Sequence, residues 1–400
     1  MEKVKQGSFR EVLSAFLKLG SSSFGGPTAH LALFRQEFVS RRRWIPEAEF
    51  AELAGLCQFL PGPSSSQVAF AIGLLRAGYP GGLAAWIGFT LPSALVLILF
   101  ASGVSIFSGP AGKGILHGLK VAAVAIVANA VREMFTALCP DAKRAFIALI
   151  SLLIILSTSS PALQIVALLL GGVAGYWICR EPLRRGRDAL SVPVSREAAV
   201  AALATFLLLL AGAPFFREMT GSEAAAQFNA FFRSGALVFG GGHVVLPFLR
   251  EAFVTPGWLS NDAFLAGYGA AQAVPGPLFT FAAYLGAVIR PSGYGLPGAA
   301  LGLAGIFLPG ILLLIGMLPF WKACQMNTGV QAAMHGVKAA VVGLLGAALY
   351  RPIGISALLT RWDFAIALTL LFLLIRWRVS PLVIVLAGAA GGVLIEVFAS

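Results

Sequence analysis

Two short motifs rich in glycine and proline each occur twice in this chain, and their chemistry suits the binding of an anion. A Phe-Gly-Gly motif at residues 24–26 recurs at residues 239–241, and a Pro-Gly-Pro motif at residues 61–63 recurs at residues 275–277. A helix that begins just after such a break presents free backbone N–H groups and the positive end of its dipole. The four breaks therefore predict four helix starts that suit an anion.

Polar side chains beside the breaks add hydrogen-bond donors to this predicted site. They are Thr28, Gln58, Ser64, Ser65, Gln272 and Thr280. The glycines contribute differently, because a residue without a β-carbon lets the backbone approach a ligand closely. A break could instead serve helix packing or a kink. That alternative weakens because each break recurs at the matching place in both halves.

A third motif, His-Gly-x-Lys, occurs at residues 117–120 and again at residues 335–338. Its lysines, Lys120 and Lys338, lie several residues inside predicted membrane spans, where a cation is costly and usually pairs or serves a transport pathway. We expect both lysines to add positive potential to a central cavity shared by the two halves. The alternative is a lysine that extends to the membrane interface beside a packed histidine.

The composition is that of a membrane protein. Hydrophobic residues make up 58% of the chain and charged residues 12%, with a mean hydropathy of +0.86, against roughly 45–50% and about 25% in soluble domains. The net charge of +12 comes from short basic clusters between apolar stretches, as loops at a membrane surface require. Nucleic acid is therefore not an expected partner.

The sequence offers no pattern for a metal centre, a cofactor or an enzyme. Its cysteines, Cys57, Cys139, Cys179 and Cys324, are isolated and lack the Cys-x-x-Cys spacing of zinc sites. The four histidines form no His-Glu-x-x-His motif, and no Gly-x-x-x-x-Gly-Lys nucleotide-binding loop occurs. We therefore expect no metal, no cofactor, no enzymatic activity and no nucleotide-driven pump within the chain.

The two halves predict the same order of helices around these breaks. In each half, two pairs of short helices flank the two breaks, and each helix is too short to cross a hydrocarbon core of ~30 Å. Each pair is therefore predicted to enter the membrane and turn back, with its freed backbone groups satisfied by protein or a watery cavity. The short helices are predicted at residues 9–23, 29–39, 47–60 and 64–77, and at 228–238, 244–254, 262–273 and 278–288.

Four spans are predicted to follow the hairpins of each half. They cover residues 82–107, 114–135, 145–156 and 161–178 in the first half, and 298–321, 329–350, 363–375 and 381–398 in the second. One further apolar segment, residues 198–210, has no counterpart. The predicted division is a first repeat at residues 1–179, a basic cytoplasmic linker with one extra transmembrane helix at 180–227, and a second repeat at 228–400.

Each half begins and ends on the same side in this arrangement, so the single extra span must invert the second half. Residues 41–43 are three arginines whereas their counterpart at 255–258 is neutral, and the neutral loop 157–160 corresponds to Arg376 and Arg378. Because basic loops mark the cytoplasmic side, this exchange supports inversion. The predicted fold class is an all-α polytopic membrane protein of two homologous halves, an inverted-topology repeat with Gly/Pro-broken re-entrant helical hairpins.

These motifs resemble the paired signature of the chromate ion transporter family in its long, two-domain form. The resemblance rests on residues 24–30 with Glu37 downstream, on 58–63, and on 239–247 and 275–277. It implies a secondary transporter that exports chromate across the bacterial inner membrane and so gives chromate resistance. Sulfate import, or exchange of chromate for sulfate, remains the alternative. The expected partners are a chromate or sulfate anion and the lipid bilayer, with a homodimer left open.

The predicted roles follow from the breaks, the lysines and this resemblance together. The predicted substrate-binding residues are Gly25, Gly26, Thr28, His30, Gln58, Gly62, Ser64, Ser65, Lys120, Gly240, Gly241, Gly242, His243, Gln272, Gly276 and Lys338. Arg35, Glu37 and Arg250 are predicted to act in coupling or gating. A salt bridge or a lipid-headgroup contact would equally suit the two arginines. Glu37 could also be a hydrated loop carboxylate beside the arginine cluster.

Overall fold

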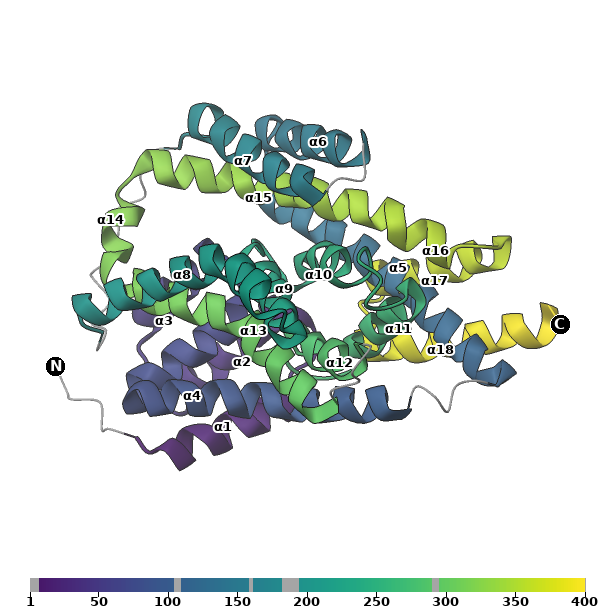
Figure 1. Cartoon of the computed structure of the whole chain (residues 1–400), viewed down its shortest axis with the longest axis horizontal. Helices are drawn as coiled ribbons and strands as arrows, with labels where there is room; N and C mark the ends of the chain where they lie inside the picture. Colours follow the sequence, from purple (N-terminus) through teal and green to yellow (C-terminus); the bar gives the residue numbers. More distant parts are fainter. Residues whose placement is uncertain (1–6, 104–108, 158–160, 182–193, 290–294, 400) are drawn as a thin grey trace.

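The computed structural model describes residues 7–103, 109–157, 161–181, 194–289 and 295–399, and the regular structure of these residues is helical (Figure 1). The first half contains α1 (Phe9–Ser22), α2 (Gly26–Phe34), the π-helix η1 (Arg35–Arg41), α3 (Glu47–Phe59), α4 (Ser64–Gly103), α5 (Pro110–Leu138), α6 (Ala142–Ser157) and α7 (Pro161–Ile178). Residues 158–160 of the predicted neutral loop and 182–193 of the predicted linker lie outside the described residues.

The helix α8 (Arg196–Thr220) connects the halves, and it is longer than the apolar segment at residues 198–210 that predicted it. The second half contains α9 (Glu223–Ala236), η3 (Gly242–Val244), α10 (Val245–Phe253), α11 (Asn261–Gln272), η4 (Leu278–Thr280), α12 (Phe281–Val288), α13 (Gly295–Met317), η5 (Leu318–Phe320), α14 (Trp321–Gln325), α15 (Thr328–Ala348), η6 (Leu349–Gly354), α16 (Ile355–Ala357), α17 (Arg361–Arg376) and α18 (Pro381–Ala399).

Four helical stretches among the described residues are long and apolar enough to cross a membrane. Each half contributes two of them. They cover residues 64–103 and 112–138 in the first half, and 295–325 and 328–357 in the second. Shorter apolar helices add to them at 163–178, 278–288 and 381–396. The prediction of a polytopic, all-helical membrane protein is therefore confirmed.

A corresponding pair of phenylalanine rings packs across the first broken hairpin of each half. In the first half, the rings of Phe16 on α1 and Phe38 on η1 lie 4.7 Å apart, centroid to centroid. In the second half, Phe231 on α9 and Phe253 on α10 lie 4.4 Å apart. Because each pair joins the helix before a break to the helix after it, the chain turns back on itself at both Phe-Gly-Gly motifs, as predicted.

The 40 residues of α4 are two helices in a tight hairpin, not one straight rod. The backbone leaves helical geometry at Ala77 and Gly78, and a β-carbon at Gly82 would contact the ring of Phe70. Phe70 and Gly82 are 12 residues apart, and in a straight helix they would be separated by about 18 Å. Their contact therefore requires the chain to turn back. A division after residue 77 was predicted from the sequence and is confirmed.

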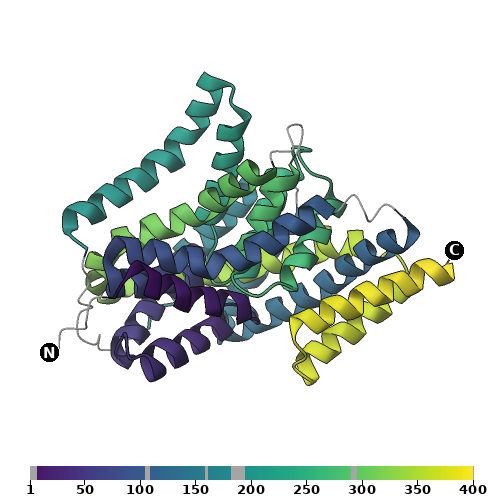
Figure 2. The ribbon, with the colours of Figure 1, turned by 90° about the horizontal axis from the view of Figure 1, so that it is seen from below.

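The two halves are interlocked through their last helices. In the first half, α5 packs along α18 and α17 of the second half, while α15 of the second half packs along α7 and α6 of the first. Figure 1 and Figure 2 show α18 lying beside α5 in both views. Both contacts are reciprocal, as a two-fold relation between the halves requires.

Glycines let the backbones meet at both of these contacts. A β-carbon at Gly118 on α5 would collide with the backbone of Gly388 on α18, and one at Gly336 on α15 would collide with that of Gly171 on α7. Close packing over small residues is characteristic of helix association in membranes, where apolar burial alone gives little driving force. The chain is therefore an inverted repeat whose halves each complete the other.

The opposite orientation of the halves predicts opposite labelling of two matched, exposed positions. In a background without the native cysteines, Arg41→Cys should react with an impermeant maleimide only from the cytoplasm. Thr255→Cys, just after α10 at the counterpart of the arginine cluster, should react only from outside. The measurement is maleimide labelling of intact cells and of inverted membrane vesicles. Reaction of both cysteines from one side would contradict the inverted arrangement.

Candidate anion-binding cavity

The four backbone breaks are joined crosswise by two matching hydrogen bonds. The N–H of Gly62 donates to the carbonyl oxygen of Val238 at 2.7 Å, and the N–H of Gly276 donates to that of Ser23 at 2.7 Å. Val238 and Ser23 directly precede the two Phe-Gly-Gly motifs. Each Pro-Gly-Pro break therefore contacts the Phe-Gly-Gly break of the other half, which brings all four breaks together.

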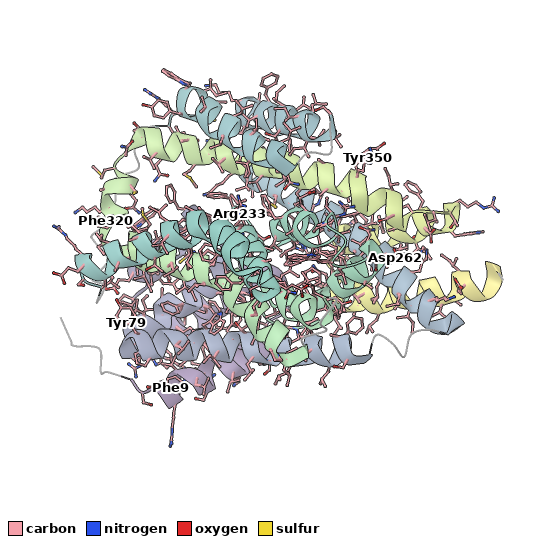
Figure 3. All side chains as sticks on the ribbon, in the orientation of Figure 1. Phe9, Tyr79, Arg233, Asp262, Phe320 and Tyr350 are labelled. Carbon is pink, nitrogen blue, oxygen red and sulfur yellow. The ribbon has the colours of Figure 1, made fainter. Side chains whose placement is uncertain are left out.

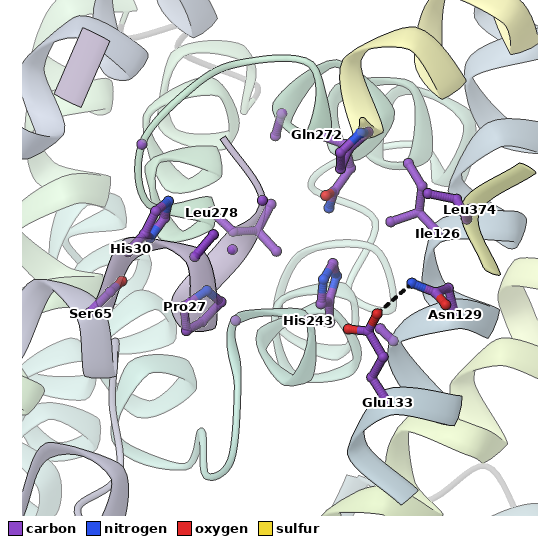
Figure 4. A pocket seen from close by; sticks show the side chains of 18 of the residues that line it. Pro27, His30, Ser65, Ile126, Asn129, Glu133, His243, Gln272, Leu278 and Leu374 are labelled. Atoms are coloured by element: carbon purple, nitrogen blue, oxygen red, sulfur yellow. Dashed lines mark hydrogen bonds between the residues drawn. The ribbon is translucent and has the colours of Figure 1, made fainter. Parts of the chain in front are cut away.

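A cavity of about 660 Å³ opens where the breaks meet (Figure 4). Its wall includes residues from every break, from the last third of α5 and from the turn between α17 and α18. The break residues in the wall are Gly25, Gly26, Pro27, Ala29, His30, Pro63, Ser64, Ser65, Gly242, His243, Gly276, Leu278 and Phe279. The end of α11 adds Ala271 and Gln272.

Nine of the predicted binding residues line this cavity. They are Gly25, Gly26, His30, Ser64, Ser65, Gly242, His243, Gln272 and Gly276. The cavity wall does not include Thr28, Gln58, Gly62, Lys120, Gly240, Gly241 or Lys338. Gly62 nevertheless contributes through its hydrogen bond to Val238, because that bond holds one break against another. The structure thus concentrates the predicted site around the helix starts.

Two polar side chains of the wall each carry a buried atom that has no hydrogen-bond partner among the described residues. One is Nδ1 of His30, whose other ring nitrogen lies 3.3 Å from the carbonyl oxygen of Ser23. The other is Nε2 of Gln272. A buried donor without a partner costs free energy unless a ligand or water satisfies it. The Gln272 amide is therefore suited to donate a hydrogen bond to a ligand in the cavity, whereas Nδ1 of neutral His30 accepts one, because its Nε2–H faces the Ser23 carbonyl oxygen.

The two halves form their helix starts differently. In the first half, α2 begins at Gly26 and α4 at Ser64, and residues of the first turn of both α-helices line the cavity, although Pro27 has no N–H to offer. In the second half, the corresponding starts are the 3₁₀ turns η3 and η4, in which the N–H of Val244 and of Thr280 already donate to backbone carbonyls. The first half therefore offers more free backbone donors.

The lysines of the His-Gly-x-Lys motifs lie outside the cavity wall. Lys120 pairs with Asp262 on α11, with 2.9 Å between Nζ and Oδ1, and Figure 3 labels Asp262. His117 lies 2.6 Å from Oδ1 of Asp363 on α17. Lys338 on α15 forms no ion pair with any described residue. Contact between either lysine and an anion stays a prediction. The observed pairs give Lys120 and His117 a structural role, because they hold α5 to the second half.

The three residues predicted to act in coupling or gating also lie outside the wall. Arg35 pairs with Glu47 at the start of α3, and its counterpart Arg250 donates a 3.1 Å hydrogen bond to Asn261 at the start of α11. Each arginine therefore ties one hairpin to the next. Glu37, outside the four long spans, pairs with Arg41 and Arg42. Burial raises its pKa, but hydrogen bonds from the two arginines outweigh burial and lower it.

Four polar residues of the wall were absent from the predicted site. Asn129, Arg132 and Glu133 come from α5, and Arg378 comes from the turn before α18. The sequence did indicate Arg132 and Glu133, because charged residues inside a predicted span such as 114–135 are costly and often functional. Arg378 gave no such signal. Only the packing of α17 and α18 against α5 places it beside the breaks.

This architecture defines a class of protein. A duplicated, multi-pass helical membrane protein whose broken helices meet around one cavity is built as a secondary transporter. The described residues contain no group of three or more His, Cys, Asp and Glu side chains that could hold a metal ion. The chain belongs to the chromate transporter family, whose sequence profile matches residues 10–176 and 225–393, one match in each half.

Several relatives that match most of the chain are named as chromate transport proteins or probable ones. The chain is 27% identical to a probable chromate transport protein of Synechococcus elongatus, over 96% of this chain and 95% of that protein. It is 29% identical to the chromate transport protein of Pseudomonas aeruginosa, over 85% and 80%. For the one from Cupriavidus metallidurans the identity is 27%, over 86% and 82%. No solved structure matches the chain.

Proposed function

We propose that this protein is a secondary transporter that exports chromate across the bacterial cytoplasmic membrane and thereby gives chromate resistance. The family and the names of the relatives support chromate as the substrate. The observation that carries the proposal is the cavity in which all four broken segments converge.

The cavity wall offers what a tetrahedral dianion needs. The first N–H groups of α2 and α4 supply backbone donors with a favourable helix dipole. Ser64, Ser65 and Gln272 add side-chain donors. Arg132 and Arg378 add positive charge at the wall. Such a site binds by hydrogen bonds and charge alone, so no cofactor is required for binding or release.

The position of the arginines supports access from the cytoplasm. Arg378 lies in the turn that the charge pattern assigns to the cytoplasmic side, and α5 presents the part nearest its cytoplasmic end, Asn129 to Glu133, to the same cavity. An anion would then enter from inside. Each net negative charge that leaves a negative-inside cell releases about 2.3 kcal/mol at 100 mV, so the membrane potential is sufficient to drive export.

Sulfate is the second candidate substrate, because backbone N–H groups and hydroxyls bind any tetrahedral dianion of similar size. Sulfate import, or exchange of sulfate for chromate, would use the same cavity. The size and charge shared by the two anions make competition between them the expected result. The preference for chromate over sulfate is therefore part of the proposal and is measured in the same experiment.

Flux in proteoliposomes tests the proposed function directly. Purified protein should carry radiolabelled chromate, faster when the compartment that holds the anion is made negative, and unlabelled sulfate should inhibit this flux. Vesicles without protein serve as the control. Sulfate flux without chromate flux would favour the sulfate carrier. Absence of both fluxes from correctly inserted protein would refute an oxyanion carrier.

A further inference from the structure

A single carboxylate lines the anion cavity among the described residues. Glu133, near the end of α5, is in the cavity wall, and Nδ2 of Asn129 donates a 2.9 Å hydrogen bond to its Oε1 (Figure 4). The carboxylate forms no ion pair with any described residue. In Figure 4 it points into the same space as the ring of His243. A negative charge in the wall opposes the binding of a dianion, so the position of Glu133 requires an explanation.

The charged and titratable groups around this carboxylate come from several elements. Those in the cavity wall are Arg132 on α5, Arg378 between α17 and α18, His30 on α2 and His243 on η3. Arg132 donates to Oδ1 of Asn129, with Nη2 at 3.3 Å. His243 lies 2.7 Å from the hydroxyl of Tyr268 through Nδ1. None of these groups neutralises Glu133 by direct contact.

The carboxylate occurs in only one half of the repeat. When the His-Gly-x-Lys motifs of α5 and α15 are aligned, the counterparts of Asn129, Arg132 and Glu133 are Ala347, Tyr350 and Arg351. The second half therefore has an arginine where the first has the glutamate. A group that appears once in a symmetric scaffold can supply only one charge change for each anion bound.

Glu133 is exposed to the space of the cavity, so an ionised Glu133 and a dianion bound in the same cavity repel each other. A proton on the carboxylate removes it. By thermodynamic reciprocity, the proton must then strengthen anion binding and the anion must strengthen proton binding by the same factor. Resting on the proposed function of this cavity, we propose that Glu133 binds one proton that is carried together with each dianion.

This proton changes the net charge that crosses the membrane with each anion. The proton comes from the water that fills the cavity, sits on a carboxylate oxygen while the anion is bound, and leaves with the anion on the other side. One net negative charge then moves per anion in place of two. Replacing Glu133 with glutamine keeps a neutral side chain of the same shape and removes the proton site, so two charges should move.

The voltage at which net flux stops measures this ratio in proteoliposomes. A tenfold anion gradient at equal pH should be balanced at about 59 mV in the wild type, which moves one charge, and at about 30 mV in Glu133→Gln, which moves two. At a fixed gradient of the dianion itself, a pH gradient should shift the balance voltage of the wild type only. Protonation of chromate itself is common to both proteins and cancels in the comparison. Glu223→Gln, an exposed residue on α9 outside the cavity, should match the wild type.

A second measurement does not depend on turnover. In detergent, wild-type protein should take up one proton for each anion bound, as followed by a pH indicator, and Glu133→Gln should take up none. This readout covers a variant that folds but transports poorly. Glu133→Asp should keep the uptake, because it keeps the carboxylate.

Each result decides the proposal. Movement of two charges per anion by the wild type, or equal balance voltages and proton uptake in wild type and Glu133→Gln, would overturn the proton site and leave the proposed transport function intact. Absence of chromate and sulfate flux and of anion binding from folded wild-type protein would instead refute the transport function on which the proton site rests.

Discussion

Gly26→Val is expected to lower chromate flux on the order of 100-fold while the protein still inserts into the membrane. Gly26 lines the cavity with φ at +78°, and a β-carbon there would meet nothing within 4 Å. Valine therefore finds room against the protein, but it fills space through which an anion reaches the first N–H groups of α2. Loss of one or two charge-assisted hydrogen bonds at about 1.5–3 kcal/mol each accounts for such a decrease.

A matched control separates this effect from backbone strain. Gly257, in the loop after α10, also has a left-handed backbone, with φ at +81°, and open space around it. A β-branched residue is strained equally at both positions, but Gly257 is not part of the cavity. Gly257→Val should therefore keep wild-type flux per inserted protein. Equal losses in both variants, or full flux in Gly26→Val, would contradict a backbone site at the start of α2.

Asp363→Ala is expected to give the largest loss of stability, about 3–5 kcal/mol of unfolding free energy. The Asp363 carboxylate is 0% exposed and accepts hydrogen bonds from His117 at 2.6 Å and from the N–H groups of Leu359 and Thr360. It therefore caps α17 and also joins this helix to α5 of the other half. Removing it leaves buried donors without a partner.

The matched control is the other ion pair on α5. Asp262 pairs with Lys120, and the Lys120 side chain is 11% exposed while that of Asp262 is 74% exposed. Because water reaches the Asp262 carboxylate, it screens the pair and can solvate the Lys120 ammonium when the carboxylate is removed. Asp262→Ala should therefore shift the unfolding midpoint much less than Asp363→Ala. The measurement is denaturant or thermal unfolding in detergent, followed by tryptophan fluorescence. Equal shifts in the two variants would show that His117 and Asp363 do not anchor α17 to α5.

Much of the secondary structure was predictable because its signals are local. The predicted segment at residues 9–23 became α1, Phe9–Ser22, and the segment at 161–178 became α7 with the same bounds. Glycine and proline fix where a helix must stop, whatever packs against it. The predicted helix at 29–39 differs, because the chain starts α2 earlier and continues as the π-helix η1, a change in winding that apolar spacing does not reveal.

The site was predictable in part for the same reason. Motif residues such as His30, Gln272 and Gly276 line the cavity, since the breaks that mark them in the sequence also build the wall. Glu133 and Arg378 reach the wall only through packing between helices. For Lys120, the sequence indicated the depth of the side chain in a span. It did not indicate the ion-pair partner, Asp262, which lies far away in the chain.

The sequence by itself determined the repeat, the apolar helices, the four breaks and the exchange of basic loops between halves, because each depends on residue types within one short window. Only the tertiary structure decided that α6 and α7 pack on α15 while α17 and α18 pack on α5. These helices carry similar apolar surfaces, so composition does not choose their partners. The choice depends on glycines such as Gly118 and Gly388, which let two particular backbones approach closely, and on the fit of surfaces that lie hundreds of residues apart.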